Sequence, residues 1–99
     1  MNPSDSTATW IEPDIVPWIG ICVRERREAV GLSQVALARK CDVSRSGLGQ
    51  LERGRKNGGT VGNLQRVCRG LGICVDELIS EAGRRARQND AMSLKKSSA

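Results

Sequence analysis

The sequence lacks most of the residue types from which catalytic and metal sites are built. Among its 99 residues there is no histidine and no tyrosine, and the only aromatic residues are two tryptophans. Four cysteines are present, but no two of them have Cys-x-x-Cys spacing: Cys22, Cys41, Cys68 and Cys74. Without a convergent acid, base or nucleophile, no enzymatic activity is expected. A metal site, a redox site or a bound cofactor has equally little support.

Long apolar runs are also missing. No segment approaches the roughly 18 apolar residues of a membrane span, and the N-terminus lacks the basic-then-apolar order of a signal peptide. Hydrophobic residues make up 38% of the chain, which is enough for one small aliphatic core in a single compact helical domain. We therefore expect a soluble, cytoplasmic protein with reduced thiols.

The positively charged residues are unevenly distributed along the chain. Sixteen Lys and Arg against eleven Asp and Glu give a formal charge of +5, which suits nucleic acid, an acidic protein or a membrane surface. Residues 1–17 contain Asp5, Glu12 and Asp14 but no Lys or Arg. The chain is therefore divided into a flexible, acidic, Pro/Ser/Thr-rich N-terminal arm (1–17), a helical domain (18–80) and a basic, polar C-terminal tail (81–99).

Apolar residues recur at helical spacing and predict an all-α fold of five helices. The expected helices run from Trp18 to just before Gly31, over 33–40, over 44–53, over 60–71, and from Val75 onward. Val30, Val35 and Val61 are among the side chains expected to face the core. Cys41 and Cys68 are interpreted as small buried hydrophobic residues, whereas a redox role for Cys22 or Cys74 is left open.

The second and third of these helices are separated by a tight turn. Ser33 and Ser44 are the expected N-caps, and Gly54 ends the second of the two helices. This spacing is typical of a helix-turn-helix, which presents its second helix to DNA. Leu48 and Leu51 set the inward face of that helix.

The outward face then carries the side chains that could read bases: Arg45, Ser46 and Gln50. Arg can bind guanine with two hydrogen bonds, Gln can do so with adenine, and Ser can bond to either base. The alternative for Arg45 is a contact to phosphate alone.

Other polar residues are candidate phosphate ligands: Gln34, Ser44, Arg53, Arg55, Lys56 and Asn57. Gln34 stands at the start of a helix, where its amide and the free backbone N–H groups can hold a phosphate. Ser44 is more a cap than a base reader, and its hydroxyl can also donate to phosphate. The loop residues lack amphipathic order, which favours either backbone clamping or simple solvation.

Several segments, taken in their order along the chain, resemble the lambda repressor/Cro-type helix-turn-helix family, also called the XRE family. They are Arg26-Arg27-Glu28, Gly31-Leu32-Ser33-Gln34, Leu37-Ala38, Val43-Ser44-Arg45-Ser46, Leu51-Glu52-Arg53-Gly54-Arg55, Leu71-Gly72-Ile73 and Asp76-Glu77-Leu78. The resemblance implies a five-helix, lambda-repressor-like DNA-binding domain that regulates transcription, as a repressor, from a dimer on a two-fold operator. It also implies a structural ion pair between Arg27 and Glu52. The chain departs from the family pattern at Gly47 and Gly49.

Two alternatives share this fold. One is an antitoxin of the HigA or HipB kind, which represses its own operon and would bind a toxin through the arm with Trp10 or the tail from Arg84. The other is the controller protein of a restriction-modification system. The expected homodimer would form through the last helix, with Leu78 and Ile79, or through Trp10 and Ile11 of the arm.

Overall fold

The computed structural model describes residues 13–55 and 61–98, with side chains described as far as residue 90. The elements are α2 (Val16–Ala29), α3 (Gln34–Cys41), α4 (Arg45–Glu52), α5 (Val61–Leu71) and α6 (Val75–Ser98). No strand occurs in the described ranges, so the predicted all-α, five-helix fold is confirmed. Lys56, Asn57, Trp10 and Ile11 lie outside the described residues.

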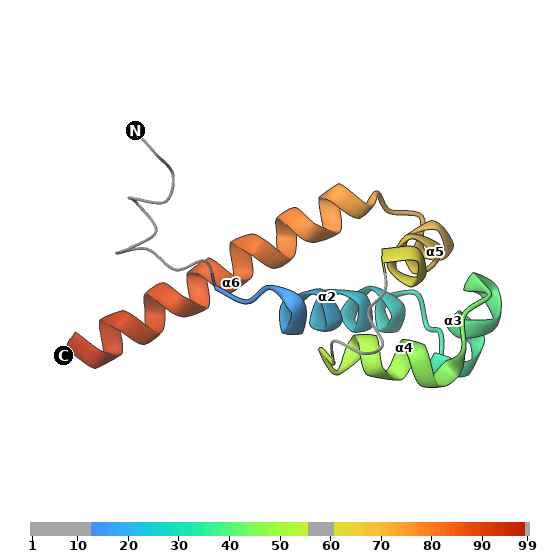
Figure 1. Cartoon of the computed structure of the whole chain (residues 1–99), viewed down its shortest axis with the longest axis horizontal. Helices are drawn as coiled ribbons and strands as arrows, with labels where there is room; N and C mark the ends of the chain where they lie inside the picture. The colour runs from blue at the N-terminus through green and yellow to red at the C-terminus, as the bar shows by residue number, and fades with distance from the viewer. Residues whose placement is uncertain (1–12, 56–60, 99) are drawn as a thin grey trace.

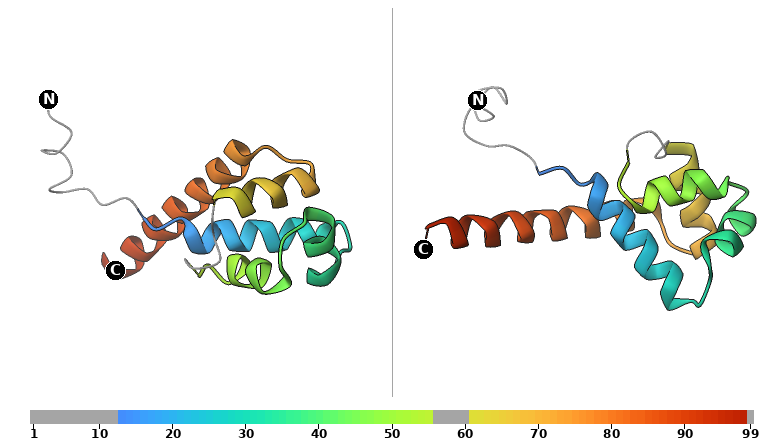
Figure 2. Two further views of the ribbon diagram at one scale, coloured as in Figure 1. Left: turned by 45° about the vertical axis from the view of Figure 1, so that its right-hand side comes forward. Right: turned by 90° about the horizontal axis from the view of Figure 1, so that it is seen from below.

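Helix α2 is the centre of the fold. It contacts α4, α5 and α6, while α3 contacts both α4 and α5 (Figure 1). The views in Figure 2 show α4 on one side of α2 and α6 crossing the other. The largest fully buried side chains come from all five helices: Cys22, Val23, Leu37, Leu48, Val67, Cys68 and Leu78. This arrangement leaves α3 and α4 at the edge of the domain.

Three valines expected in the core are exposed, so this expectation was wrong. The exposed fractions are 60% for Val30, 41% for Val35 and 72% for Val61. Val30 follows the last residue of α2, and Val61 is the first residue of α5. Helical periodicity places a side chain on a face, but at a helix end the neighbouring helix need not extend far enough to cover it.

The cysteines divide into buried and exposed thiols. Cys41 and Cys68 are buried, which confirms that part of the interpretation, and Cys22 is buried as well. Burial, together with a hydrogen bond involving Glu81, raises the pKa of Cys22 to about 11. Cys74 is exposed. The buried thiols are therefore neutral core groups near pH 7.

Helix α6 runs without a break across residue 80, where the basic, polar tail was expected to begin. Ala82 and Ala86 are buried. Arg85 pairs with Glu25 of α2 at 2.6 Å, and its guanidinium lies 5.3 Å from the centre of the Trp18 ring. Residues 81–87 therefore belong to the packed body, and the end of α6 extends beyond the other helices (Figures 1 and 2). No helix in the described part is long and apolar enough to cross a membrane.

Gly20 allows α2 to lie against the C-terminal end of α4. A Cβ atom at this position would overlap the carbonyl oxygen of Leu51 and would lie 2.6 Å from that of Glu52. Both neighbours are backbone atoms, so they cannot move aside without shifting a helix. The distance between α2 and α4 thus depends on the absence of a side chain at residue 20.

We predict that Gly20→Ala lowers the free energy of unfolding by about 1–3 kcal/mol, because the overlap outweighs the gain in helix propensity. Urea denaturation followed by circular dichroism measures the change. The matched control is Gly62→Ala in α5, where an added Cβ meets nothing within 4 Å and should raise stability by about 0.5–1 kcal/mol. Equal effects of the two substitutions would contradict the close approach.

Candidate nucleic-acid interface

Two serine caps begin α3 and α4, and one left-handed residue lies in the turn between these helices. The Ser33 Oγ accepts a hydrogen bond from the backbone N–H of Ala36 at 3.1 Å, and the Ser44 Oγ accepts one from Gly47 at 2.9 Å. Asp42 ends α3 with a φ of 56°. Both predicted caps are confirmed, and they set the first turns of α3 and α4 as the sequence indicated.

A buried ion pair joins α2 to α4. The Arg27 Nε donates to Glu52 Oε2 at 2.7 Å, and its Nη2 donates to Glu52 Oε1 at 3.1 Å. The Arg27 Nη1 also donates to the carbonyl of Leu32 at 2.7 Å. The hydrogen bond to Glu52 raises the pKa of Arg27. This is the pair that the family resemblance predicted, and it carries the two-bond geometry that gives arginine-carboxylate pairs their directionality.

Gln34 has a contact that the sequence did not reveal. Its side-chain Nε2 donates to Glu52 Oε1 at 3.0 Å, so the first residue of α3 is tied to the last residue of α4. The same carboxylate thereby holds groups from α2 and α3. The sequence predicted only a phosphate contact for Gln34, because a contact between residues 18 positions apart has no local signal.

The exposed side of α4 is hollowed. Leu48 and Leu51 are buried, which confirms the predicted phase of this helix, and Arg45 and Ser46 are exposed. A hollow of about 400 Å³ is lined by Gln34, Arg45, Ser46, Gly49 and Arg53. The structure thus brings together four of the predicted contact residues around Gly49. None of the described residues that line this hollow carries a carboxylate, so its charge favours an anionic ligand.

The remaining predicted residues do not line this hollow, and Lys56 and Asn57 lie outside the described residues. Gln50 is half-buried and does not line the hollow, and Arg55 is exposed in the segment after α4. Ser44 caps α4.

The two glycines of α4, Gly47 and Gly49, each make room for a different neighbouring side chain. A Cβ on Gly47 would lie 2.9 Å from the Ser44 Oγ, so glycine leaves room for the capping hydroxyl. A Cβ on Gly49 would lie 3.4 Å from the guanidinium of Arg53. Gly49 therefore contributes open space between the side chains that line the hollow.

Comparison with known sequences decides the family. A family model described as a helix-turn-helix domain matches residues 18–82. The chain belongs to the helix-turn-helix family. Its members are DNA-binding transcriptional regulators. The match extends two residues past the expected end of the domain at residue 80 and into the packed part of α6.

Individual helix-turn-helix proteins are similar over most of the fold. The control protein C.MunI from a Mycoplasma species is 38% identical over 56 residues, which is 57% of this chain and 74% of that protein. The clp gene regulator ClgR from Corynebacterium glutamicum has a TM-score of 0.74 at 31% identity, covering 84% of this chain and 87% of that chain. The restriction-modification controller protein C.AhdI from Aeromonas hydrophila has a TM-score of 0.59 at 36% identity, covering 64% and 94% respectively. These relatives are named as regulators and controllers rather than enzymes.

We predict that Glu52→Ala lowers the free energy of unfolding by about 3–5 kcal/mol, because it leaves the Arg27 guanidinium buried without its carboxylate. Arg27→Ala should also destabilise the protein, and the double variant should lose clearly less than the sum of the two single losses. Urea titrations of the three variants complete this cycle.

The control for that cycle is Arg24→Ala, which removes the exposed i,i+4 pair with Glu28. Its cost should stay within about 0.5 kcal/mol. Strictly additive losses at Arg27 and Glu52 would show that the pair does not act as a unit.

Proposed function

We propose that this helix-turn-helix protein is a transcriptional repressor that binds a two-fold DNA operator as a homodimer through the exposed side of α4. The observation that carries the proposal is the carboxylate-free hollow lined by Arg45, Ser46, Arg53 and Gln34. This surface lies on a helix whose orientation is held by the buried Arg27–Glu52 pair. A rigid, positively charged edge of this size suits the major groove.

The roles of individual residues follow from their positions on α3 and α4. Arg45 and Ser46 stand in the first turn of α4, where a helix end entering the groove meets base edges; with Gln50 they are the proposed base readers. Gln34 is held by Glu52 next to the same hollow and is positioned for phosphate. Phosphate contacts are also proposed for Ser44, Arg53 and Arg55, together with Lys56 and Asn57 outside the described residues.

We expect Arg45→Ala to relax base preference at one position of each half-site, with a loss of about 1–3 kcal/mol of discrimination there. In contrast, Arg55→Ala should weaken binding to all sequences and reduce the salt dependence of log K by about one unit. Selection of bound duplexes from a random library, followed by fluorescence anisotropy at several salt concentrations, tests both. If Arg45→Ala weakens selected and random duplexes equally, its base-reading role is wrong.

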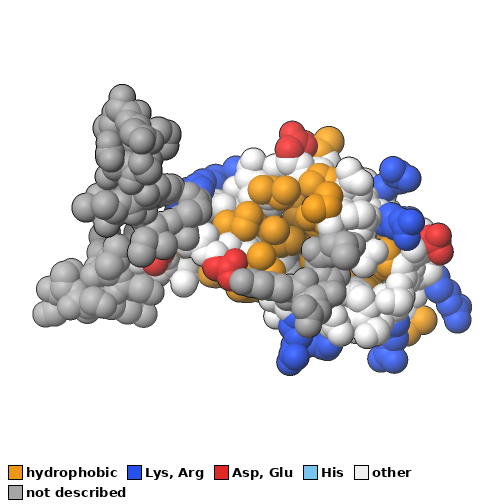
Figure 3. All heavy atoms as spheres, viewed as in Figure 1, with side chains coloured by type: hydrophobic (Ala, Val, Ile, Leu, Met, Phe, Trp, Pro, Cys, Tyr) orange, Lys and Arg blue, Asp and Glu red, His pale blue; other side chains and the backbone are white. Residues whose placement is uncertain are grey.

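A homodimer is proposed because one recognition helix covers only about half a turn of DNA, whereas two-fold operators present two half-sites roughly 34 Å apart. Leu78, expected at the dimer surface, is fully buried in the core and is unavailable for it. Ile79 is 38% exposed and lines a hollow with Ile15, Gly83 and two arginines. Figure 3 shows hydrophobic atoms gathered on the face over α6 and the helices beside it. We place the dimer contact at Ile79.

Ile79→Asp is therefore expected to shift the protein towards monomers, because it replaces an apolar contact by a carboxylate that would have to lose its hydration at the interface. Sedimentation velocity over a range of concentrations measures this shift. Val30→Asp is the matched control at an exposed valine beyond the end of α2 and should leave the association unchanged. A dimer that survives Ile79→Asp would exclude this surface.

The controller protein of a restriction-modification system is a second candidate function, favoured by the similarity to C.MunI and C.AhdI. Genomic footprinting distinguishes the candidates: bound sites upstream of an endonuclease gene would support a controller, and sites upstream of a toxin gene would support an antitoxin. The toxin partner stays a prediction, since residues 1–12 of the arm lie outside the described residues. A cytoplasmic location also stays a prediction.

We infer no enzymatic activity. In the segments that the structure describes, no group of three or more Cys, Asp or Glu side chains could hold a metal ion. The named relatives are regulators, and we assign the charged groups described above to packing or to a nucleic-acid contact.

A further inference from the structure

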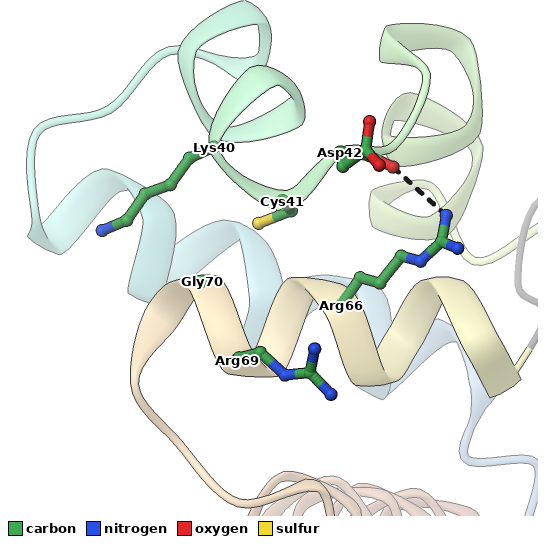
Figure 4. A pocket seen from close by; sticks show the side chains of 6 residues that line it. All are labelled: Lys40, Cys41, Asp42, Arg66, Arg69 and Gly70. Atoms are coloured by element: carbon green, nitrogen blue, oxygen red, sulfur yellow. Dashed lines mark hydrogen bonds between the residues drawn. The ribbon is translucent and has the colours of Figure 1, made fainter.

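A second basic hollow lies between α3 and α5, away from the α4 hollow. It has a volume of about 410 Å³ and is lined by Lys40, Cys41, Asp42, Arg66, Arg69 and Gly70 (Figure 4). Figure 4 shows Lys40 extending from the end of α3 to one side and the two arginines extending from α5 to the other. The volume is in the range of sites that hold small molecules.

The three cations of this hollow have no ion-pair partner within the described residues, although Asp42 also lines it. By contrast, arginines that face the contact between α2 and α6 are paired: Arg26 with Glu81 and Arg85 with Glu25. Figure 3 shows Lys and Arg side chains grouped at the end of the molecule where α3 and α5 lie. Three positive charges against one carboxylate therefore leave the hollow with a net charge that favours an anion.

The floor of the hollow is neutral and closely packed. A Cβ on Gly70 would overlap the Sγ of Cys41, so glycine permits the thiol to lie directly against α5. Burial raises the pKa of Cys41, and the thiol therefore carries no charge near pH 7. A bound anion would meet no negative group at the floor.

The position of the hollow separates it from the proposed DNA contact. Gln34, at the first turn of α3, lines the α4 hollow, whereas Lys40 and Cys41 stand at the last turn of α3. Six or seven residues of helix place these ends about 10 Å apart. A phosphate held at Gln34 is therefore not the anion that the second hollow would hold.

The hollow nevertheless touches the turn that leads into α4. The Arg66 Nη1 donates to the backbone carbonyl of Asp42 at 3.2 Å. Asp42 is the left-handed residue that ends α3, two positions before the Ser44 cap of α4. An anion that draws the Arg66 guanidinium towards itself would compete with this hydrogen bond and so bias the turn.

We propose that the hollow formed by Lys40, Arg66 and Arg69 binds a small anion bearing two or more phosphate charges, as an effector of DNA binding. The effector role rests on the proposed function, whereas the anion site does not. Exposed cations bind a single charge weakly in water, so a multivalent anion is needed to use all three side chains. Charge-assisted hydrogen bonds from two guanidinium groups suit phosphate oxygens.

Titration with inorganic pyrophosphate in the absence of DNA tests the site. Ionic strength is held constant with sodium chloride. We expect saturable one-to-one binding in calorimetry, with amide chemical-shift changes centred on residues 40–42 and 66–70. The double variant Arg66→Gln/Arg69→Gln should lose at least tenfold in affinity. Arg24→Gln/Lys95→Gln, which removes the same charge from α2 and α6, should stay within about threefold.

Several results would overturn the site. One is the absence of saturable pyrophosphate binding. Another is an equal loss of pyrophosphate affinity in both double variants. Shift changes centred on Gln34 and Arg45 would mean that pyrophosphate only imitates DNA phosphates. Binding of a glutamate-rich peptide to these residues without binding of pyrophosphate would identify an acidic protein surface instead.

The effector role is tested separately with DNA. Pyrophosphate at constant ionic strength should change the affinity for a selected duplex at least threefold in the unsubstituted protein and not in Arg66→Gln/Arg69→Gln. If pyrophosphate binds but the affinity for DNA does not change, the effector role is overturned and the anion site is retained. Failure to bind any duplex while pyrophosphate still binds would instead reject the proposed function.

Discussion

The carboxylate of Glu52 is the group on which the arrangement of α2, α3 and α4 depends. It receives hydrogen bonds from Arg27 of α2 and from Gln34 of α3, while Arg27 also holds the carbonyl of Leu32 in the segment between those helices. Because burying two charges carries a large desolvation cost, such a pair contributes less to net stability than to orientation. One side chain at the end of α4 thus relates three helices to one another.

Glycines and small core residues complement the Arg27–Glu52 pair. The chain has few aromatic residues, so its core is filled by short aliphatic groups and thiols, and the helices come close together. Gly20 lets the backbone of α2 approach the end of α4, and Gly70 lets α5 approach Cys41. Such contacts leave no space for relaxation, because packed interiors are nearly as dense as molecular crystals. Small residues and one buried pair together define the distance and angle at which α4 is presented.

The charges of the protein divide into two groups with different roles. On α2 and α6, arginines meet glutamates, and Arg85 additionally covers the ring of Trp18. These contacts attach α6 to the domain. On α3, α4 and α5, several cations line hollows and have no acidic partner among the described residues. Positive charge without an acidic partner is therefore available at the edge of the domain formed by α3, α4 and α5.

The sequence by itself determined the five helices, the caps Ser33 and Ser44 and the inward phase of Leu48 and Leu51, because these depend on local spacing. Its resemblance to a known family supplied the Arg27–Glu52 pair. Only the tertiary structure decided that Gln34 is held by Glu52, that Gly20 sits against α4 and that α6 continues past residue 80. It also decided that Lys40 shares a hollow with α5. These contacts join residues far apart in the sequence, and their geometry exists only once the helices have packed.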